Sequence, residues 1–247
     1  MRLSQAWIVT RHDLRLLRER KTILATLVGF PIAVAVGFPL LVRYILAHTS
    51  AAVHAGSYLP GLIDSFSFWF VIGGVSVPVA IASYSIVGEK LEKSLEPLLA
   101  TPTTDGEILL GKTLAAFLPT VIAVLAAAVV FMVLIDRVTG SALGYAYYPN
   151  PTMDVLLAGV TPLSVLVSIE ATILVSSRAT DVRTVQQSAG LLFLPFILLY
   201  LAGEIGVLDL DATTLLEIAG ILGAACLGLF FLTVRTFDRN EILTRWR

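Results

Sequence analysis

Long apolar stretches recur along the whole chain, and they constrain its fold more than any other feature. A helix that crosses the hydrocarbon core of a bilayer needs about 20 apolar residues. Stretches of this kind occupy residues 22–46, 66–87, 112–135, 156–175, 185–201 and 214–234. The stretch at 185–201 is the weakest because it is short and begins beside Gln186 and Gln187, but its second half is too apolar to lie in water. The sequence therefore predicts an all-α integral membrane protein with six transmembrane helices.

Composition excludes an ordinary soluble domain. Of the 247 residues, 57% are hydrophobic and 14% are charged, whereas soluble domains carry about 25% charged residues. The formal net charge of −1 gives no sign of a nucleic-acid partner. The single cysteine, Cys226, offers neither an internal disulfide nor a cysteine metal site. We expect residues 1–247 to form a single transmembrane domain in contact with membrane lipids, because no connection is long enough for a catalytic domain.

The basic residues predict the orientation of the chain in the membrane. Lys and Arg residues near the ends of spans remain on the cytoplasmic side. Of the 17 Lys and Arg residues, all except Arg43 and Arg137 fall on the side of the predicted spans that holds both termini. The sequence thus predicts a multi-pass protein of the cell membrane with both termini in the cytoplasm.

Residues 1–21 have the pattern of an amphipathic helix. One side of a helical wheel collects the apolar or small positions Leu3, Ala6, Trp7, Thr10, Leu14 and Leu17. Arg2, His12, Arg15 and Glu19 lie on the opposite side. An Arg-rich helix with a Trp on its apolar side is typical of the membrane interface, so we expect an interfacial elbow helix before the first span. The pattern fits a simple anchor as well as a gating element.

The connection at residues 88–111 predicts two short helices. Ser94 can cap the first, in which Leu95, Leu98 and Leu99 share one face, and Thr101 and Pro102 end it. Thr104 and Glu107 have the spacing of a capping box that starts the next helix. The leucine face indicates either a docking surface for a partner or a contact with lipid headgroups.

A phosphate-loop pattern, G-x-x-x-x-G-K-[ST], occurs at residues 106–113. That loop requires a preceding buried strand and a following helix that packs on a sheet. Here a capped turn precedes the pattern, its interior is helix-forming, and the helix after it enters the third apolar stretch. We therefore interpret the match as a coincidence.

The same connection resembles the ABC-2 family of ATP-binding-cassette transporter permeases. Members of that family carry approximately Glu-Arg-Glu-x-Gly-Thr-Leu-Glu-x-Leu-Leu-x-Thr-Pro between the second and third spans, followed by an acidic residue, Ile or Leu, and Gly-Lys. The matching positions are Glu89, Lys90, Ser94, Leu95, Glu96, Leu98, Leu99, Thr101, Pro102, Glu107, Ile108, Gly111 and Lys112. Lys93 replaces the usual glycine and Leu91 an acidic residue. The interfacial helix, the layout of six spans and the basic tail also agree with the family.

The resemblance implies a permease that pairs with a second copy, identical or related, and sits on two ATP-binding subunits. The helix around residues 95–100 would be a coupling helix, and Glu89, Glu96, Glu107 and the Leu and Thr-Pro residues beside them would form the docking segment. The family implies an exporter in most cases. It also implies that ATP and magnesium are held by the partner subunit, so that this chain itself binds no cofactor and is not an enzyme.

Several residues inside the spans could carry function. Glu170 lies four to six residues inside the fourth span, where it could form part of a gate or pathway, or could reach interfacial water or pair with Arg178. The residues Ser164, Ser168 and Thr172 are expected to form hydrogen bonds between helices. Small residues on one face of the last span, Gly220, Ala224 and Gly228, predict close packing within the bundle.

Two other classes of protein were weighed against a permease. An autonomous channel or secondary carrier would carry ionisable residues near the middle of its spans, and only Glu170 points that way. An intramembrane enzyme is disfavoured because His12, His48 and His54 all lie outside the spans, and neither H-E-x-x-H nor G-x-S-x-G occurs. The channel or carrier is the alternative that the sequence leaves open.

Overall fold

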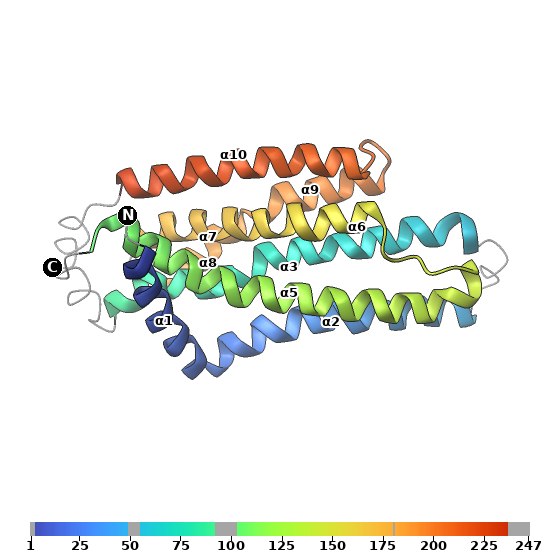
Figure 1. Ribbon diagram of the computed structural model, residues 1–247, viewed down its shortest axis with the longest axis horizontal. Coiled ribbons are helices and arrows are strands. Elements are labelled where there is room, and N and C mark those ends of the chain that lie inside the picture. Colours follow the sequence, from blue (N-terminus) through green and yellow to red (C-terminus); the bar gives the residue numbers. More distant parts are fainter. Residues whose placement is uncertain (1–2, 49–54, 92–102, 180, 237–247) are drawn as a thin grey trace.

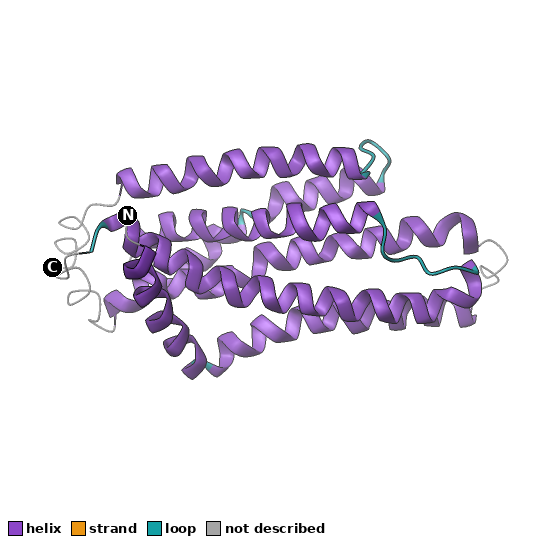
Figure 2. Ribbon diagram, viewed as in Figure 1, coloured by secondary structure: helices purple, strands orange, loops and turns teal. Residues whose placement is uncertain are grey.

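The structure is a computed structural model that describes residues 3–48, 55–91, 103–179 and 181–236. Within these residues every regular element is a helix (Figure 2). The elements are α1 (Leu3–Glu19), α2 (Lys21–His48), α3 (Ala55–Leu91), α5 (Asp105–Leu143), α6 (Pro151–Val155), the π-helical turn η2 (Leu156–Val160), α7 (Thr161–Arg178), α8 (Val182–Gly190), α9 (Phe193–Glu204) and α10 (Ala212–Thr236). Six segments among them are long and apolar enough to cross a membrane, which confirms the predicted class of fold.

The long helices lie side by side along the longest axis of the molecule (Figure 1). The end of the bundle that holds α1 also holds the last turns of α3, α7 and α10 and the first turns of α5 and α8. The connections from α5 to α6 and from α9 to α10 lie at the opposite end. The last turn of α3 and the first turn of α5 therefore lie at the same end of the bundle as α1.

Helices α3 and α7 form the centre of the bundle, where most of their residues are buried, whereas α9 and α10 are mostly exposed. The aromatic core joins α3 to α5, since the rings of Phe70 and Phe131 meet edge to face with centroids 5.3 Å apart. Helix α3 begins at Ala55, earlier than the predicted start at residue 66. The apolar pattern marked only the most apolar part of this helix, which continues through Asp64, a residue that lines a cavity together with residues of α9 such as Tyr200 and Glu204.

The fifth predicted span consists of two helices, α8 and α9, separated by a turn at Leu191 and Leu192. Proline has no backbone N–H, so Pro195 cannot donate to the carbonyl four residues earlier, which belongs to Leu191. Shorter bonds replace the missing one, because the amide of Leu194 donates to the oxygen of Leu191 over 3.2 Å. Together the two helices still give a segment of 23 residues with the hydropathy of a span.

The fourth span contains a π-helical turn, which the apolar pattern did not predict. In η2 the amide of Thr161 donates to the oxygen of Leu156, five residues earlier. Pro162 follows directly, and its ring would collide with the carbonyl of a regular α-helical turn. The wider turn relieves this conflict, so that α6, η2 and α7 form one continuous span.

The small residues of α10 are not where the sequence predicted them. Gly220, Ala224 and Gly228 are exposed, and a Cβ atom added to either glycine would meet nothing within 4 Å. The expectation of close packing within the bundle is therefore wrong. Helix α10 instead packs through Leu215, Ala219 and Thr233, the residues that it buries, and small-residue spacing alone carries no information about which face meets a neighbour.

Candidate functional site

The candidate site lies where the predicted docking segment enters α5. Of the docking residues, Glu89 lies in the last turn of α3. The residues Leu95, Glu96, Leu98, Leu99, Thr101 and Pro102 lie outside the described residues, as does the coupling helix that they predict. The described part of the site therefore comprises the start of α5 and the helices that contact it.

A capping box starts α5, as the sequence predicted. The amide of Glu107 donates to Oγ1 of Thr104 over 3.4 Å, and the amide of Thr104 donates to Oε2 of Glu107 over 3.0 Å. Both side chains thus satisfy backbone amides that a helix start leaves without partners. The carboxylate of Glu107 is turned back on its own helix, and the residue is only 5% exposed. Its observed role is to fix the direction in which α5 begins.

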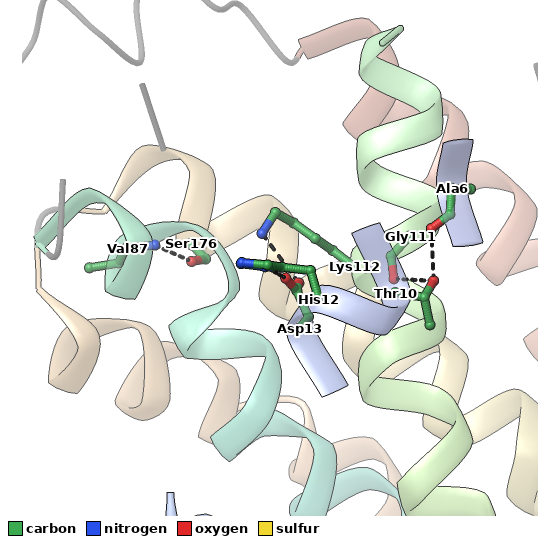
Figure 3. Close-up of polar contacts among 8 residues, drawn as sticks. All are labelled: Ala6, Thr10, His12, Asp13, Val87, Gly111, Lys112 and Ser176. Atoms are coloured by element: carbon green, nitrogen blue, oxygen red, sulfur yellow. Dashed lines mark hydrogen bonds and ion pairs between the residues drawn. The ribbon is translucent and has the colours of Figure 1, made fainter. Parts of the chain in front are cut away.

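Helix α1 packs directly on the backbone of α5 at Gly111 (Figure 3). The hydroxyl of Thr10 donates to the oxygen of Gly111 over 3.0 Å and to the oxygen of Ala6, in its own helix, over 2.9 Å. A Cβ atom at Gly111 would lie 2.7 Å from the oxygen of Ala6 and 2.7 Å from Cβ of Val9. These distances are too short for any side chain, so the close approach of the two helices requires glycine at this position.

An ion pair lies beside this contact. Nζ of Lys112 in α5 is 3.5 Å from Oδ2 of Asp13 in α1, and the Lys112 side chain is only 1% exposed (Figure 3). His12 contacts the other oxygen of the same carboxylate, with Nδ1 3.3 Å from Oδ1. A lysine buried so completely requires a negative partner, because an isolated buried charge is costly. Asp13 supplies that partner and fixes α1 on α5.

The phosphate-loop pattern forms part of this contact and not a nucleotide site. Residues 106–113 all lie in α5, which begins at Asp105, so they form no loop that could cradle a phosphate. The lysine of the pattern, Lys112, is buried against α1. The interpretation of the pattern as a coincidence agrees with this geometry.

Helix α1 divides its predicted apolar side between two environments. Ala6, Thr10 and Leu17 are buried, whereas Leu3 and Trp7 are exposed. The buried members of this side lie on the bundle, and the exposed members point away from it. The placement of α1 in the membrane interface remains a prediction.

Glu170 of α7 also contacts α5, at the residue that follows Lys112. The hydroxyl of Thr113 donates to Oε1 of Glu170 over 2.7 Å, and Glu170 is 2% exposed. Its other oxygen, Oε2, is buried without a partner among the described residues. Within the described chain Glu170 neither reaches water nor pairs with Arg178, so the simpler of the two sequence interpretations does not fit. A buried carboxyl group with one open oxygen keeps Glu170 as a candidate for a gate or pathway.

Serine side chains hold α7 against α3 at this end of the bundle. The hydroxyl of Ser168 donates to the oxygen of Val75 over 2.6 Å, and that of Ser176 to the oxygen of Ser83 over 3.2 Å. Ser176 also accepts from the amide of Val87 over 3.3 Å (Figure 3). Of the three residues expected to bond between helices, Ser168 does so. The hydroxyls of Ser164 and Thr172 instead donate to carbonyl oxygens four residues earlier in the same span.

The sequence argument missed Asp13 and Ser176 as members of the site. A usable signal for Asp13 was the isolated Lys112 at the edge of an apolar stretch, because such a charge needs a partner. The sequence could not say which acidic residue supplies it. No group of three or more His, Cys, Asp or Glu residues that could hold a metal ion occurs in the described part of the chain.

The spans and the buried polar contacts that join α1, α3, α5 and α7 define a multi-pass integral membrane protein. The chain belongs to the ABC-2 transporter family, since the profile described as "ABC-2 family transporter protein" matches residues 7–221. It is therefore a membrane-spanning permease of an ABC transporter, a kind of subunit that is not itself catalytic and generally works as a dimer with an ATP-binding subunit. No curated protein matches the chain.

Proposed function

We propose that this permease belongs to an ATP-driven exporter and receives its driving force through residues 88–111. In this proposal two ATP-binding subunits hold ATP and magnesium, and a second permease copy completes the pathway. The leucine face at residues 95–99 docks on the ATP-binding subunit, and α5 carries the resulting movement into the membrane. Membership of the ABC-2 family is the main support for this function.

The geometry at the start of α5 supports the proposed route of transmission. The capping box at Thr104 and Glu107 fixes the first turn of α5, directly after the predicted docking residues Thr101 and Pro102 in the sequence. Four to six residues after Glu107, α5 is bonded to α1 at Gly111 and Lys112 and to α7 at Thr113. A displacement of the docking segment would therefore move three helices together.

The proposed topology has both termini and the docking segment in the cytoplasm of a cell membrane. The first turns of α1 and α5 and the last turns of α3 and α10 lie at one end of the bundle (Figure 1). In the sequence all Lys and Arg residues except Arg43 and Arg137 fall on the side of the spans that holds the termini, and such residues favour the cytoplasmic side. An ATP-binding subunit would meet the permease at this end.

The first experiment is to purify the tagged full chain from its native membranes in mild detergent and to identify its stoichiometric partners. We expect an ATP-binding subunit to co-purify, and the double substitution Leu95→Glu and Leu98→Glu to abolish its recovery while insertion in the membrane is unchanged. The matched control is Leu95→Met and Leu98→Met, which keeps an apolar face of similar volume. Unchanged recovery with the Glu variant would contradict the docking role.

A second measurement tests the division of labour between the subunits. We expect the isolated chain to bind no ATP, with or without the substitution Lys112→Ala. Specific ATP binding by the isolated chain would contradict the assignment of nucleotide to the partner. If the chain purified alone under several mild conditions, an autonomous channel or secondary carrier would become the better account, and Glu170 would be the first residue to substitute.

A further inference from the structure

The structure brings together the two basic residues that depart from the charge pattern of the chain. Arg43 of α2 and Arg137 of α5 line one open groove of about 730 Å³ at the end of the bundle opposite α1. The other residues that line it are Leu46, Ala47, Leu134, Val138, Ser141 and Ala142. The groove is thus an apolar surface with two guanidinium groups, and its volume falls within the range of ordinary ligand sites.

No acidic side chain offsets these charges in the groove. Asp136, the neighbour of Arg137, is turned to the other side, where its Oδ1 accepts from the amides of Tyr147 and Tyr148 over 2.9 and 3.1 Å. Among the described residues neither guanidinium group has a hydrogen bond or an ion pair. Residues 49–54, which follow α2 in the sequence, contain no Asp or Glu. The groove therefore presents two unneutralised positive charges.

The position of the arginines along their helices sets their depth. Arg43 lies five residues before the end of α2 and Arg137 six before the end of α5. Relative to the predicted spans, Arg43 lies three residues before the end of the first span at residue 46, and Arg137 lies two residues after the end of the third span at residue 135. From either position a long arginine side chain reaches the headgroup region. The ends of α2 and α5 each carry a partial negative charge of about half a unit, which two full positive charges exceed.

We propose that this groove binds the headgroup of an anionic membrane lipid. Arg43 and Arg137 hold the phosphate oxygens, for which the planar guanidinium group is well suited because it donates two parallel hydrogen bonds. The apolar walls, such as Leu134 and Val138, contact the upper part of the acyl chains. The site is separate from the docking segment, so the inference does not depend on the proposed function.

A lipid fits the groove better than free phosphate because of the surface that continues from it. Further along the same two helices, Leu40 and Leu41 of α2 and Val130 and Val133 of α5 are exposed. In a membrane-spanning chain these faces meet acyl chains. A molecule with a charged head and apolar tails satisfies both parts of the surface, whereas inorganic phosphate satisfies only the guanidinium groups.

The test is native mass spectrometry of the purified permease, in its complex where one is recovered, titrated with phosphatidylglycerol and with phosphatidylcholine. We expect the anionic lipid to bind more tightly. Since a basic residue near a charged membrane surface contributes about 1 kcal/mol, each of Arg43→Gln and Arg137→Gln should weaken its binding about fivefold and the double variant about 25-fold. Arg178→Gln, an exposed arginine at the opposite end of the bundle, is the matched control and should leave binding unchanged.

Three controls separate the possible sources of the effect. Thermal unfolding of each variant shows whether it is folded, and Arg43→Lys with Arg137→Lys should restore part of the affinity by restoring the charge. Inorganic phosphate at millimolar concentration should not displace the lipid. Equal lipid binding by the double Gln variant and the unsubstituted protein would overturn the proposal, and displacement by inorganic phosphate would assign the site to free phosphate instead.

Discussion

The two ends of helix α5 make contacts of different kinds. At its start, Gly111, Lys112 and Thr113 bond to residues of α1 and α7 that are 57 to 101 positions away in the sequence. Near its other end, Asp136 bonds to the backbone of the loop that follows the same helix, 11 and 12 residues later. The side-chain bonds at the start of α5 thus join separate helices, whereas the bonds of Asp136 reach only the loop that follows the same helix.

This difference indicates which substitutions in α5 should disturb other helices and which should disturb only the adjoining loop. A change at the start of α5 removes contacts among three helices, so its effect should extend to α1. A change near the end of α5 should disturb one loop and leave the helices in place. The three predictions below test this contrast, and the first two each pair a substitution with a control in the same helix.

The largest effect is expected for Gly111→Leu. The new side chain would overlap the backbone of α1 at Ala6, which cannot move without its helix. We expect a loss of about 3 kcal/mol in the free energy of unfolding, as for severe overpacking, and faster hydrogen–deuterium exchange across residues 3–19. The control is Gly140→Leu in the same helix, where an added Cβ atom meets nothing within 4 Å. Equal exchange in the two variants would contradict the close contact at Gly111.

An intermediate effect is expected for Asp136→Ala. Two backbone amides, those of Tyr147 and Tyr148, lose their acceptor, which should cost about 2 kcal/mol in the free energy of unfolding. Faster exchange should be confined to residues 144–150, with residues 3–19 unchanged. Asp136→Asn keeps the Oδ1 atom that accepts both bonds and should retain most of the stability. If exchange also rose across α1, the local character of this end would be wrong.

The smallest effect is expected for Arg137→Gln, directly beside Asp136. Arg137 is exposed and has no partner among the described residues, so the free energy of unfolding in detergent should change by less than about 0.5 kcal/mol. Thermal unfolding in detergent measures this change. A much larger loss would mean that the arginine supports the fold, and its position in the groove would then need no ligand.

The sequence predicted those parts of the fold that depend on local patterns. Apolar stretches located all six spans, and the spacing of Thr104 and Glu107 located the start of α5. The break between α8 and α9 also has a local signal in Pro195, because a proline within a span predicts a kink. In each case the information lies within a few residues of the feature that it predicts.

The contacts of the candidate site had no such local signal. Three contacts depend on how helices far apart in the sequence pack together. These are the pairing of Lys112 with Asp13, the approach of Gly111 to α1, and the placement of Arg43 and Arg137 in one groove. The direction faced by Gly220 and its neighbours depends on the same information. A helical pattern fixes which residues share a face, but the partner of that face is set by the tertiary structure.

The attachment of α1 to α5 also has a consequence for the order in which the chain is assembled. Thr10 and its acceptor at Gly111 are 101 residues apart, and ribosomes add about 5 to 20 residues per second. Roughly 5 to 20 s therefore pass between the synthesis of Thr10 in α1 and the synthesis of Gly111, to which it bonds. During that time α2 and α3 are synthesised, and on the predicted placement of α1 in the membrane interface its exposed Leu3 and Trp7 and the apolar residues that it later buries would all be available to lipid. The amphipathic character of α1 is thus needed first by the nascent chain, before the finished protein uses it.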